Sequence, residues 1–363
     1  MAYYDVRRID GRLERKMLGH DAATARKELG RLEVHIEEGR YQPVRAVRFR
    51  TFADEWLEGL RRRSTTAANY AITLGYAKRA FGSKQVSKLG VADVRKMLEL
   101  VEQEHRDRQK RRAPKRKPRE VSPATAAKHM RQLSSCLEAA VAEGLLASNP
   151  CKKLPKSQRP KPAKRSPSYF TNDELTRLWP ELVGRPVWLT AFKLLATTGM
   201  RFGELAGLRW SDVRLLEGEL HIRRQFTAGE EVDTTKGGKP RVVHLVPAAR
   251  SLLDEWYRET GDAGLVFESE LGGHLDGSGA RAMLTRAMKR AGIPAVGEGG
   301  GKRTVHSLRH TFARVALENG APIQWVKDEL GHSTIVLTVD LYGSWSQEAS
   351  KVAAERLEGA FAV

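Results

Sequence analysis

The fold of this chain is decided by residues 306–342, which read HSLRHTFARVALENGAPIQWVKDELGHSTIVLTVDLY. Leu308 and Phe312 recur at helical spacing within this stretch, and with the apolar residues that follow they predict an amphipathic helix. His306 and Arg309 lie three residues apart near the start of that helix, so their side chains share one face. Both side chains can therefore point toward one place.

A second helix is expected directly afterwards. Pro322 suits the first turn of a helix, and Gly331 suits the position just past a helix end. His332 then stands at a sharp exit and can face a cleft, with Tyr342 ten residues further along the chain. Taken singly, each of these side chains is more often structural than catalytic, so their meaning depends on motifs elsewhere in the sequence.

Two upstream motifs supply that context. They are TTGMRFGELAGLRWSDV at residues 197–213 and TTKGGKPRVVHL at residues 234–245. The first adds an arginine and the second adds a lysine in an expected hairpin turn. Arg, Lys, His-x-x-Arg, His and Tyr in this order resemble the signature of the tyrosine recombinases, also called the phage integrase family. The resemblance implies a catalytic set of six residues: Arg201, Lys236, His306, Arg309, His332 and Tyr342.

The chemistry of strand transfer explains why these residue types belong together. Breaking a phosphodiester and rejoining it without losing its bond energy requires a covalent intermediate, and a phenol can supply the attacking oxygen. The resemblance makes Tyr342 this nucleophile, which displaces a 5′ hydroxyl and forms a 3′-phosphotyrosyl link. Arg201 and Arg309 suit the charge that develops on the phosphoryl oxygens, because guanidinium groups carry forked donors. Glu204 is expected to orient the arginines and not to react itself.

The remaining catalytic positions concern protons. His306 and His332 can share hydrogen bonding to the phosphate with proton transfer from the phenol, and the sequence leaves open which of them moves the proton. Lys236 matches the position of the family's catalytic lysine and is the expected general acid for the leaving 5′ oxygen. No carboxylate cluster suggests Mg²⁺ and no His-Glu-x-x-His motif occurs, so we expect catalysis without metal, ATP or another cofactor.

Length and charge agree with a DNA-binding protein of several domains. At 363 residues the chain is expected to form two or three domains, and its net charge of +19 indicates a polyanionic partner, either nucleic acid or an anionic membrane. No apolar run approaches the ~18 to 20 residues that span a bilayer, and the N-terminus lacks the apolar core of a signal peptide. Cys136 and Cys151 have no paired spacing, which argues against disulfides and structural zinc. We expect a bacterial cytoplasmic protein that works on DNA.

Residues 1–48 are expected to form a small N-terminal module. Two short strands flank Asp10-Gly11, a dipeptide that favours a tight hairpin turn, and Asp21 can cap a helix that ends near Gly39. A sheet with one helix resembles the arm-binding domain that integrases of phages and mobile elements carry. The alternative is a small ordered extension used for protein contacts.

Residues 51–148 read as four helices, which resembles the helical, SAM-like core-binding domain of the family. Such a domain forms one half of a clamp around the duplex. Between the third and fourth helices, residues 106–119 carry nine Lys or Arg against one Asp, together with two prolines. That composition predicts a mobile basic loop along the DNA phosphates, with a merely solvated loop as the alternative. Its DNA-binding candidates are Lys110, Arg111, Arg112, Lys115, Arg116 and Lys117.

Residues 149–168 are Pro-rich and basic, as in an extended connector between domains. Lys152 and Lys153 are further DNA-binding candidates within this connector. Residues 106–119 carry a net charge of +8 and residues 152–165 carry +7, so most of the excess charge lies in two tracts. Phosphate contacts of this kind give affinity without sequence preference, and they predict binding that weakens steeply with salt.

Residues 169–363 are expected to form the catalytic domain. Thr171 and Glu174 have the spacing of a capping box, so a helix begins there. Three short strands are expected further along, at residues 219–224, 230–235 and 241–246. The last two should pair as a hairpin. The C-terminal tail can form an apolar-sided helix, which either packs on its own domain or docks on a neighbouring protomer, as in related proteins.

The fold class expected from these parts is mainly α with small β-sheets (α+β). The resemblance implies a C-shaped clamp, in which the core-binding domain is followed by a mixed helical catalytic domain with a three-stranded sheet. The implied partners are double-stranded DNA attachment sites and a homotetramer on two duplexes, with no membrane partner. The attachment-site sequences, the direction of recombination, and the need for an excisionase or a DNA-bending protein stay open.

Two other functions fit parts of the pattern. A catalytically inactive, integrase-derived DNA-binding regulator would keep the fold, although the presence of all six catalytic residue types argues against it. A type IB topoisomerase would share the chemistry without needing two sites, and the three-module layout favours the recombinase. No basic amphipathic helix supports a membrane-surface role. We therefore expect a site-specific recombinase (integrase) that integrates or excises a mobile element.

Overall fold

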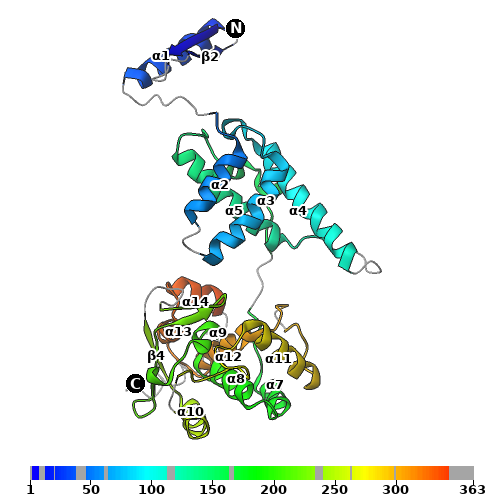
Figure 1. Cartoon of the computed structure of the whole chain (residues 1–363), viewed down its shortest axis with the longest axis vertical. Coiled ribbons are helices and arrows are strands. Elements are labelled where there is room, and N and C mark those ends of the chain that lie inside the picture. The colour runs from blue at the N-terminus through cyan, green and yellow to red at the C-terminus, as the bar shows by residue number, and fades with distance from the viewer. Residues whose placement is uncertain are drawn as a thin grey trace, which may run out of the picture. The chain divides into compact units, whose positions relative to one another are not determined.

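The computed structural model divides the chain into two compact units, Met1–Ala163 and Lys164–Val363 (Figure 1). Both units contain a hydrophobic core of their own. The structure describes residues 2–7, 13–19, 21–37, 46–60, 64–112, 119–162, 167–233, 240–261, 264–297 and 300–342. No helix within these ranges is long and apolar enough to cross a membrane. The predicted class, mainly α with small antiparallel sheets, is confirmed.

The N-terminal residues form a β-hairpin and one helix. Strand β1 (Ala2–Arg7) pairs antiparallel with β2 (Leu13–Gly19), and helix α1 (Ala22–Glu37) contacts both strands. Asp21 caps the helix, because its Oδ1 accepts a hydrogen bond from the backbone N–H of Thr24 at 2.8 Å. The two strands and the capped helix agree with expectation, while the Asp10-Gly11 turn lies outside the described residues.

Four long helices form most of the rest of the first unit. They are α2 (Phe49–Leu60), α3 (Ser64–Phe81), α4 (Val91–Arg112) and α5 (Pro123–Ala142), with a 3₁₀ turn η1 (Val86–Lys88) before α4. Their apolar faces meet in one core, which includes the fully buried Phe49, Leu74, Met97, Leu133 and Leu137. The four predicted helices are therefore present, with ends set by signals such as the Ser122 cap and the proline that follows it.

Helix α4 is longer than the sequence suggested. The expected loop at residues 106–119 is wrong for its first half, because residues 106–112 continue the helix. Arg, Lys and Gln are good helix formers, and the prolines that would end a helix come only at positions 114 and 118. Gln109 also ties down the returning chain, since its side chain exchanges two hydrogen bonds with the backbone of Arg119 at 2.8 and 2.9 Å.

The expected extended connector is also wrong over its first half, because residues 150–158 are folded onto the first unit. Helix α6 (Pro150–Lys153) and the 3₁₀ turn η2 (Lys156–Gln158) occupy this stretch. The side chain of Asn149 caps α6 by accepting from the backbone N–H of Cys151 at 3.0 Å. Cys151 and Leu154 are buried, so an Asn-Pro helix start followed by two apolar residues outweighs the basic composition.

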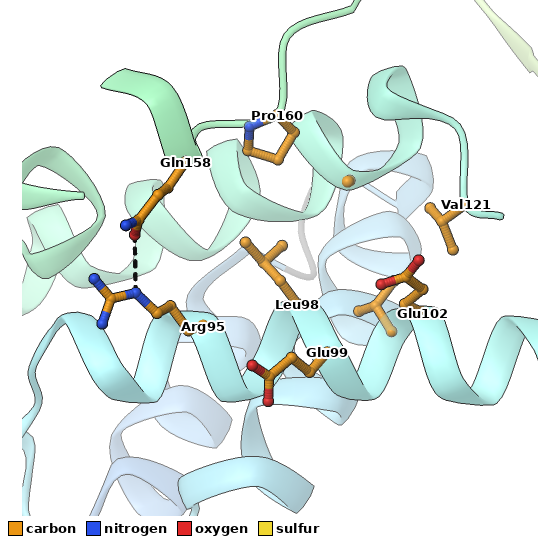
Figure 2. A pocket seen from close by; sticks show the side chains of 9 residues that line it. Arg95, Leu98, Glu99, Glu102, Val121, Gln158 and Pro160 are labelled. Atoms are coloured by element: carbon orange, nitrogen blue, oxygen red, sulfur yellow. Dashed lines mark hydrogen bonds between the residues drawn. The ribbon is translucent and has the colours of Figure 1, made fainter. Parts of the chain in front are cut away.

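A groove of about 450 Å³ lies between α4 and the segment that contains Gln158 and Pro160. Leu98, Glu99 and Glu102 of α4 line one side of it, and Gln158 and Pro160 line another (Figure 2). A hydrogen bond of 2.9 Å from the Nε of Arg95 to the Oε1 of Gln158 joins the two sides. None of the residues predicted for catalysis lines this groove.

The two cysteines lie in this first unit as well. Cys136 on α5 has no exposed surface, and Cys151 on α6 is 4% exposed. Both are free thiols, and burial raises the pKa of each to about 12. They therefore act as small apolar core residues.

The second unit is built around the apolar helix α8 (Pro186–Thr198). It packs against α12 (Val305–Glu318) and α10 (Pro247–Thr260), and their buried side chains include Phe192, Leu195, Leu253 and Leu308. The other helices and turns of this unit are α7 (Asn172–Leu178), η3 (Trp179–Leu182), α9 (Phe202–Ala206), η4 (Trp210–Asp212), α11 (Gly277–Arg290), α13 (Ile323–Leu330) and α14 (Ile335–Tyr342). The predicted capping box is present at the start of α7, between Thr171 and Glu174.

The strands of the second unit pair differently from the prediction. A three-stranded antiparallel sheet has the order β3 (Val213–Arg214), β4 (Glu219–Ile222) and β7 (Arg241–His244). Strand β6 (Glu230–Val232) does not pair with β7 and instead forms a separate hairpin with β5 (Gln225–Thr227). The reason is local, because the two residues between β5 and β6 have φ angles of 55° and 85°, as a tight hairpin turn requires.

Candidate active site

Helix α12 presents the first arginine of the site. The helix starts at Val305, where the Ser307 hydroxyl accepts from the backbone N–H of Thr304 at 3.0 Å. Arg309 then lies in the second turn and is 2% exposed. Its Nη1 donates to the carbonyl of Gly199 at 2.8 Å, and its Nη2 donates to the carbonyl of Leu330 at 2.6 Å. One buried guanidinium thus holds together the ends of α8 and α13.

Arg201 lies on the turn that follows α8. Gly199 ends that helix in the left-handed conformation, with a φ of 64°, and Arg201 caps the short helix α9. The Nη1 of Arg201 donates to the Oε1 of Glu204 at 2.7 Å, and its Nη2 donates to the carbonyl of Gly331 at 3.1 Å. Its side chain is 24% exposed, so the guanidinium is held by these bonds and still reaches the surface. Glu204 contacts the arginine in the way the sequence suggested.

A third arginine, Arg241, joins this cluster although the sequence motifs do not single it out. Its Nη1 and Nη2 donate to the two carboxylate oxygens of Glu204 at 2.9 and 2.8 Å. Its Nε donates to the carbonyl of Glu329 at 2.9 Å. The one signal in the sequence is that a charged residue opens an otherwise mostly apolar strand. That signal alone does not distinguish a buried arginine from a solvated one.

Glu204 therefore serves two arginines at once. It is 1% exposed, and such burial by itself would raise the pKa of its carboxyl. The hydrogen bonds and charge of Arg241, with the charge of Arg201, outweigh burial and lower the pKa to about 2. The carboxylate is consequently ionised at neutral pH and holds both guanidiniums in fixed orientations.

His332 lies at the exit of α13, beside these arginines. Gly331 ends the helix with a φ of 62°, and the backbone N–H of His332 donates to the carbonyl of Lys327 at 3.1 Å. The ring is 9% exposed, and its Nδ1 lies 2.8 Å from the hydroxyl oxygen of Thr338 on α14. Burial and the positive charges of Arg309 and Arg201 lower the pKa of His332 to about 3. The imidazole is therefore neutral at physiological pH.

Two histidines share the start of α12. His306 is exposed, and its ring meets the ring of His310 edge-on with centroids 4.8 Å apart. Burial and the nearby His306 and Arg309 lower the pKa of His310 to about 3. His310 is a second residue that the sequence motifs do not single out. The signal for it is its position four residues after His306, which places both rings on one side of the helix.

The other predicted residues lie partly outside the described parts. Lys236 is not described, and for Tyr342 the structure gives the end of α14 but no side chain. Of the basic DNA-binding candidates, the exposed side chains of Lys110 and Arg111 lie on α4. Lys152 and Lys153 are exposed on α6, and the structure does not describe the side chains of Arg112, Lys115, Arg116 and Lys117.

The described site is a cluster of basic side chains. Arg201 and Arg241 share the carboxylate of Glu204, and Arg309 is bonded to backbone carbonyls at the ends of α8 and α13. The two shifted histidines are neutral, so these three arginines and one glutamate carry an excess positive charge. Rigid guanidinium groups with donors fixed by backbone carbonyls suit a phosphodiester whose charge grows in the transition state. Within the described ranges there is no group of three or more His, Cys, Asp or Glu side chains that could hold a metal ion.

Comparison with known proteins gives consistent matches. The model of the phage integrase family matches residues 169–348. A tyrosine recombinase XerC-like protein of Caldanaerobacter subterraneus subsp. tengcongensis is 30% identical over 234 residues, which cover 56% of this chain and 58% of that protein. The chain thus spans about three fifths of the length of this relative.

Solved structures of integrases share the fold. The Tn1549 transposon integrase in complex with transposon right end DNA has a TM-score of 0.66 at 17% identity, over 86% of this chain and all (100%) of that one. A lambda integrase tetramer bound to a Holliday junction has a TM-score of 0.60 at 21% identity, over 96% of this chain and 93% of that one. At this identity the likeness concerns the fold.

Proposed function

Because this chain belongs to the phage integrase family, the tyrosine recombinases, through its residues 169–348, we propose that it is a site-specific DNA recombinase. It cleaves and rejoins DNA strands through a 3′-phosphotyrosyl intermediate and integrates or excises a mobile element. The observation that carries this proposal is the convergence of Arg201, Arg309 and His332 at the ends of α8 and α13. That cluster offers fixed donors where a scissile phosphate would sit.

Tyr342 is the nucleophile in this proposal. Its phenolic oxygen attacks the phosphorus, a new bond to phosphorus forms, and the bond from phosphorus to the 5′ oxygen breaks. The position of Tyr342 supports this role, because it lies one helical turn after Thr338, whose hydroxyl contacts His332. Attack by a 5′ hydroxyl of the partner strand then reverses the step and releases the tyrosine.

The charged and titratable side chains divide the remaining work. Arg201 and Arg309 stabilise the negative charge on the phosphoryl oxygens, with Glu204 fixing Arg201. A neutral His332, or the exposed His306, can accept the phenolic proton during attack. The leaving 5′ oxygen takes its proton from Lys236. The bond energy stays in the phosphotyrosine, so the reaction proceeds without ATP.

The partner of this chain is double-stranded DNA. The related integrases are solved on DNA, and one of them is a tetramer on a Holliday junction. We extend this arrangement to the present chain, in which four copies hold two attachment sites while strands exchange. The N-terminal hairpin module, the helical residues 51–148 and the catalytic residues 169–363 then serve as arm-binding, core-binding and strand-transfer parts. The exposed Lys110, Arg111 and Lys152 provide phosphate contacts, and the chain acts in the bacterial cytoplasm.

The experiment that tests this function uses a suicide DNA substrate, nicked near the crossover so that the cleaved end diffuses away. The DNA comes from the region flanking the gene, and the readout is a covalent protein–DNA band on a denaturing gel. Wild-type protein should give the band, and Tyr342→Phe should give none, because phenylalanine lacks the attacking oxygen.

Each other outcome contradicts a defined part of the proposal. A band that persists in Tyr342→Phe would mean that another residue is the nucleophile. If both proteins shift DNA on native gels but no flanking fragment gives a covalent band with either, the chain is better explained as an integrase-derived DNA-binding regulator.

A further inference from the structure

We infer that Arg241 is a positioning residue for strand transfer, which holds Glu204 in the orientation that fixes Arg201 and braces the turn that carries His332. This inference rests on the proposed function. It adds to the six catalytic positions a residue that acts through its neighbours and does not itself touch the DNA.

The bonds of Arg241 are the first argument. Its Nε, Nη1 and Nη2 all donate to the protein, two to the carboxylate of Glu204 and one to the carbonyl of Glu329. Its side chain is 11% exposed, against 24% for Arg201. A guanidinium committed on three nitrogens and mostly covered is placed to orient other groups. Arg201 is the more exposed partner on the same carboxylate and is the one placed to meet a phosphate.

The turn after α13 gives the second argument. Gly331 lies so close to Arg241 that a Cβ there would be 2.9 Å from the Cδ of the arginine. The carbonyl of Gly331 accepts from Arg201, and His332 is the next residue. Arg241 therefore packs along the turn whose two ends hold a catalytic arginine and a catalytic histidine. Loss of its side chain would loosen both at once.

The chain connection gives the third argument. Arg241 opens strand β7, where it pairs with Ile222 of β4, and it lies five residues after Lys236 in the sequence. The strand that leads away from the proposed general acid is thus bonded to the carboxylate that orients the proposed phosphate-binding arginine. The side chain of Arg241 thus connects β7, which follows Lys236 in the sequence, to Glu204.

The second unit offers a matched control in Arg303. The Nη2 of Arg303 donates to both oxygens of Glu174, at 2.6 and 2.8 Å, and its Nε donates to the carbonyl of Tyr169 at 3.1 Å. Its side chain is 5% exposed. Arg303 is therefore another covered arginine that is bonded to a glutamate and a backbone carbonyl, but none of these partners belongs to the catalytic cluster.

The test compares Arg241→Lys and Arg241→Met with Arg303→Lys and Arg303→Met on the suicide substrate. We expect Arg241→Lys to slow formation of the covalent band by about 10- to 100-fold at saturating DNA, since small misplacements of reacting groups cost about that much. Its DNA affinity on native gels should stay that of the wild type. Arg303→Lys should lower the melting temperature at least as much while leaving the cleavage rate of the folded protein unchanged.

A second measurement places Arg241→Lys in a Glu204→Gln background. Because the proposed effect runs through Glu204, the lysine substitution should slow cleavage much less there than in the wild type. Wild-type cleavage rates in the Arg241 variants, or losses that only follow the folded fraction as for Arg303, would overturn the inference. Absence of a covalent band with the wild-type protein would instead contradict the proposed function itself.

Discussion

At the scale of single residues, the site depends on one carboxylate that is shared by two arginines. Glu204 is almost fully buried, and removing it would leave Arg201 and the mostly covered Arg241 without their shared carboxylate. An uncompensated buried charge is strongly destabilising, typically by about 3 to 5 kcal/mol. Glu204 therefore contributes both to folding and to the orientation of Arg201, the proposed phosphate-binding group.

Acid should destabilise the protein in two steps. The pKa values of His310 and His332 are lowered from 6.5 to about 3 in the folded protein. Below pH 6.5 these histidines therefore bind protons in the unfolded chain but not in the folded one. Stability is thus lost as pH falls from 6.5 toward 3. Glu204, with its pKa lowered to about 2, contributes stability above 4.5 that is lost between 4.5 and 2.

The first step can be measured by urea unfolding between pH 7 and pH 5. The wild-type free energy of unfolding should fall by roughly 2 kcal/mol for each fully shifted histidine at pH 5. His310→Gln removes one of these groups and should flatten the pH dependence. An equally steep dependence in the variant would show that His310 carries no proton linkage.

The residue scale also shows where sequence reasoning stops. Arg201, Arg309 and His332 could be predicted because short motifs surround them, and Glu204 because it lies three residues from Arg201. Arg241 could not, since its partners are 37 and 88 positions away along the chain. Contacts of that range leave no local pattern in a single sequence.

At the scale of elements, glycines let helices and strands approach the site closely. A Cβ on Gly203 of α9 would lie 2.9 Å from the carbonyl oxygen of Phe226, and one on Gly207 would lie 3.2 Å from Gln225. The hairpin β5–β6 can therefore lie directly against the helix that Arg201 caps. The GELAG stretch is explained by this packing.

Gly331→Ala should test how much the α13 exit matters. The residue has a φ of 62°, which is costly for alanine by about 1 to 2 kcal/mol, and its new Cβ would press on Arg241. We expect at least that loss in urea unfolding, together with slower cleavage because His332 follows directly.

Gly184→Ala is the matched control, because a Cβ at Gly184 would have no atom within 4 Å and the residue has no positive φ. It should unfold and cleave like the wild type. Equal stabilities of the two variants would mean that the α13 exit relaxes without cost.

Helix positions could be predicted at this scale, whereas strand partners could not. Capping residues, prolines and glycines mark the ends of α7, α12 and α13 within a few positions. The pairing of β4 with β7 joins strands about twenty residues apart, and the turn at Ala228-Gly229 diverts β6 into its own hairpin. Such choices depend on competition between pairings, which periodicity does not report.

At the scale of the whole molecule, the two units have separate cores and an uneven share of charge. Residues 106–119 and most of the basic tract at 152–165 belong to the first unit, while the arginine cluster belongs to the second. The proposed phosphate contacts and the proposed chemistry are therefore divided between the two units.

A protein made of residues 164–363 should fold by itself and retain the arginine cluster. Its DNA affinity should fall less steeply with salt than that of the full chain, because each lost phosphate contact lowers the log–log slope by about 0.9. Native gels over a salt series measure both slopes. Identical slopes would mean that the basic tracts of the first unit do not contact phosphates.

Cys136 and Cys151, both buried in the first unit, are the two cysteines of the sequence. Their pKa values of about 12 keep both thiols protonated at neutral pH, and both are buried. Labelling reagents that react with exposed thiolates should therefore not modify them. The substitutions Lys96→Cys in the first unit and Leu271→Cys in the second would each add one reactive thiol, because both positions are exposed. Dyes attached there would measure by energy transfer, in single molecules, whether the distance between the two units changes when duplex DNA is added.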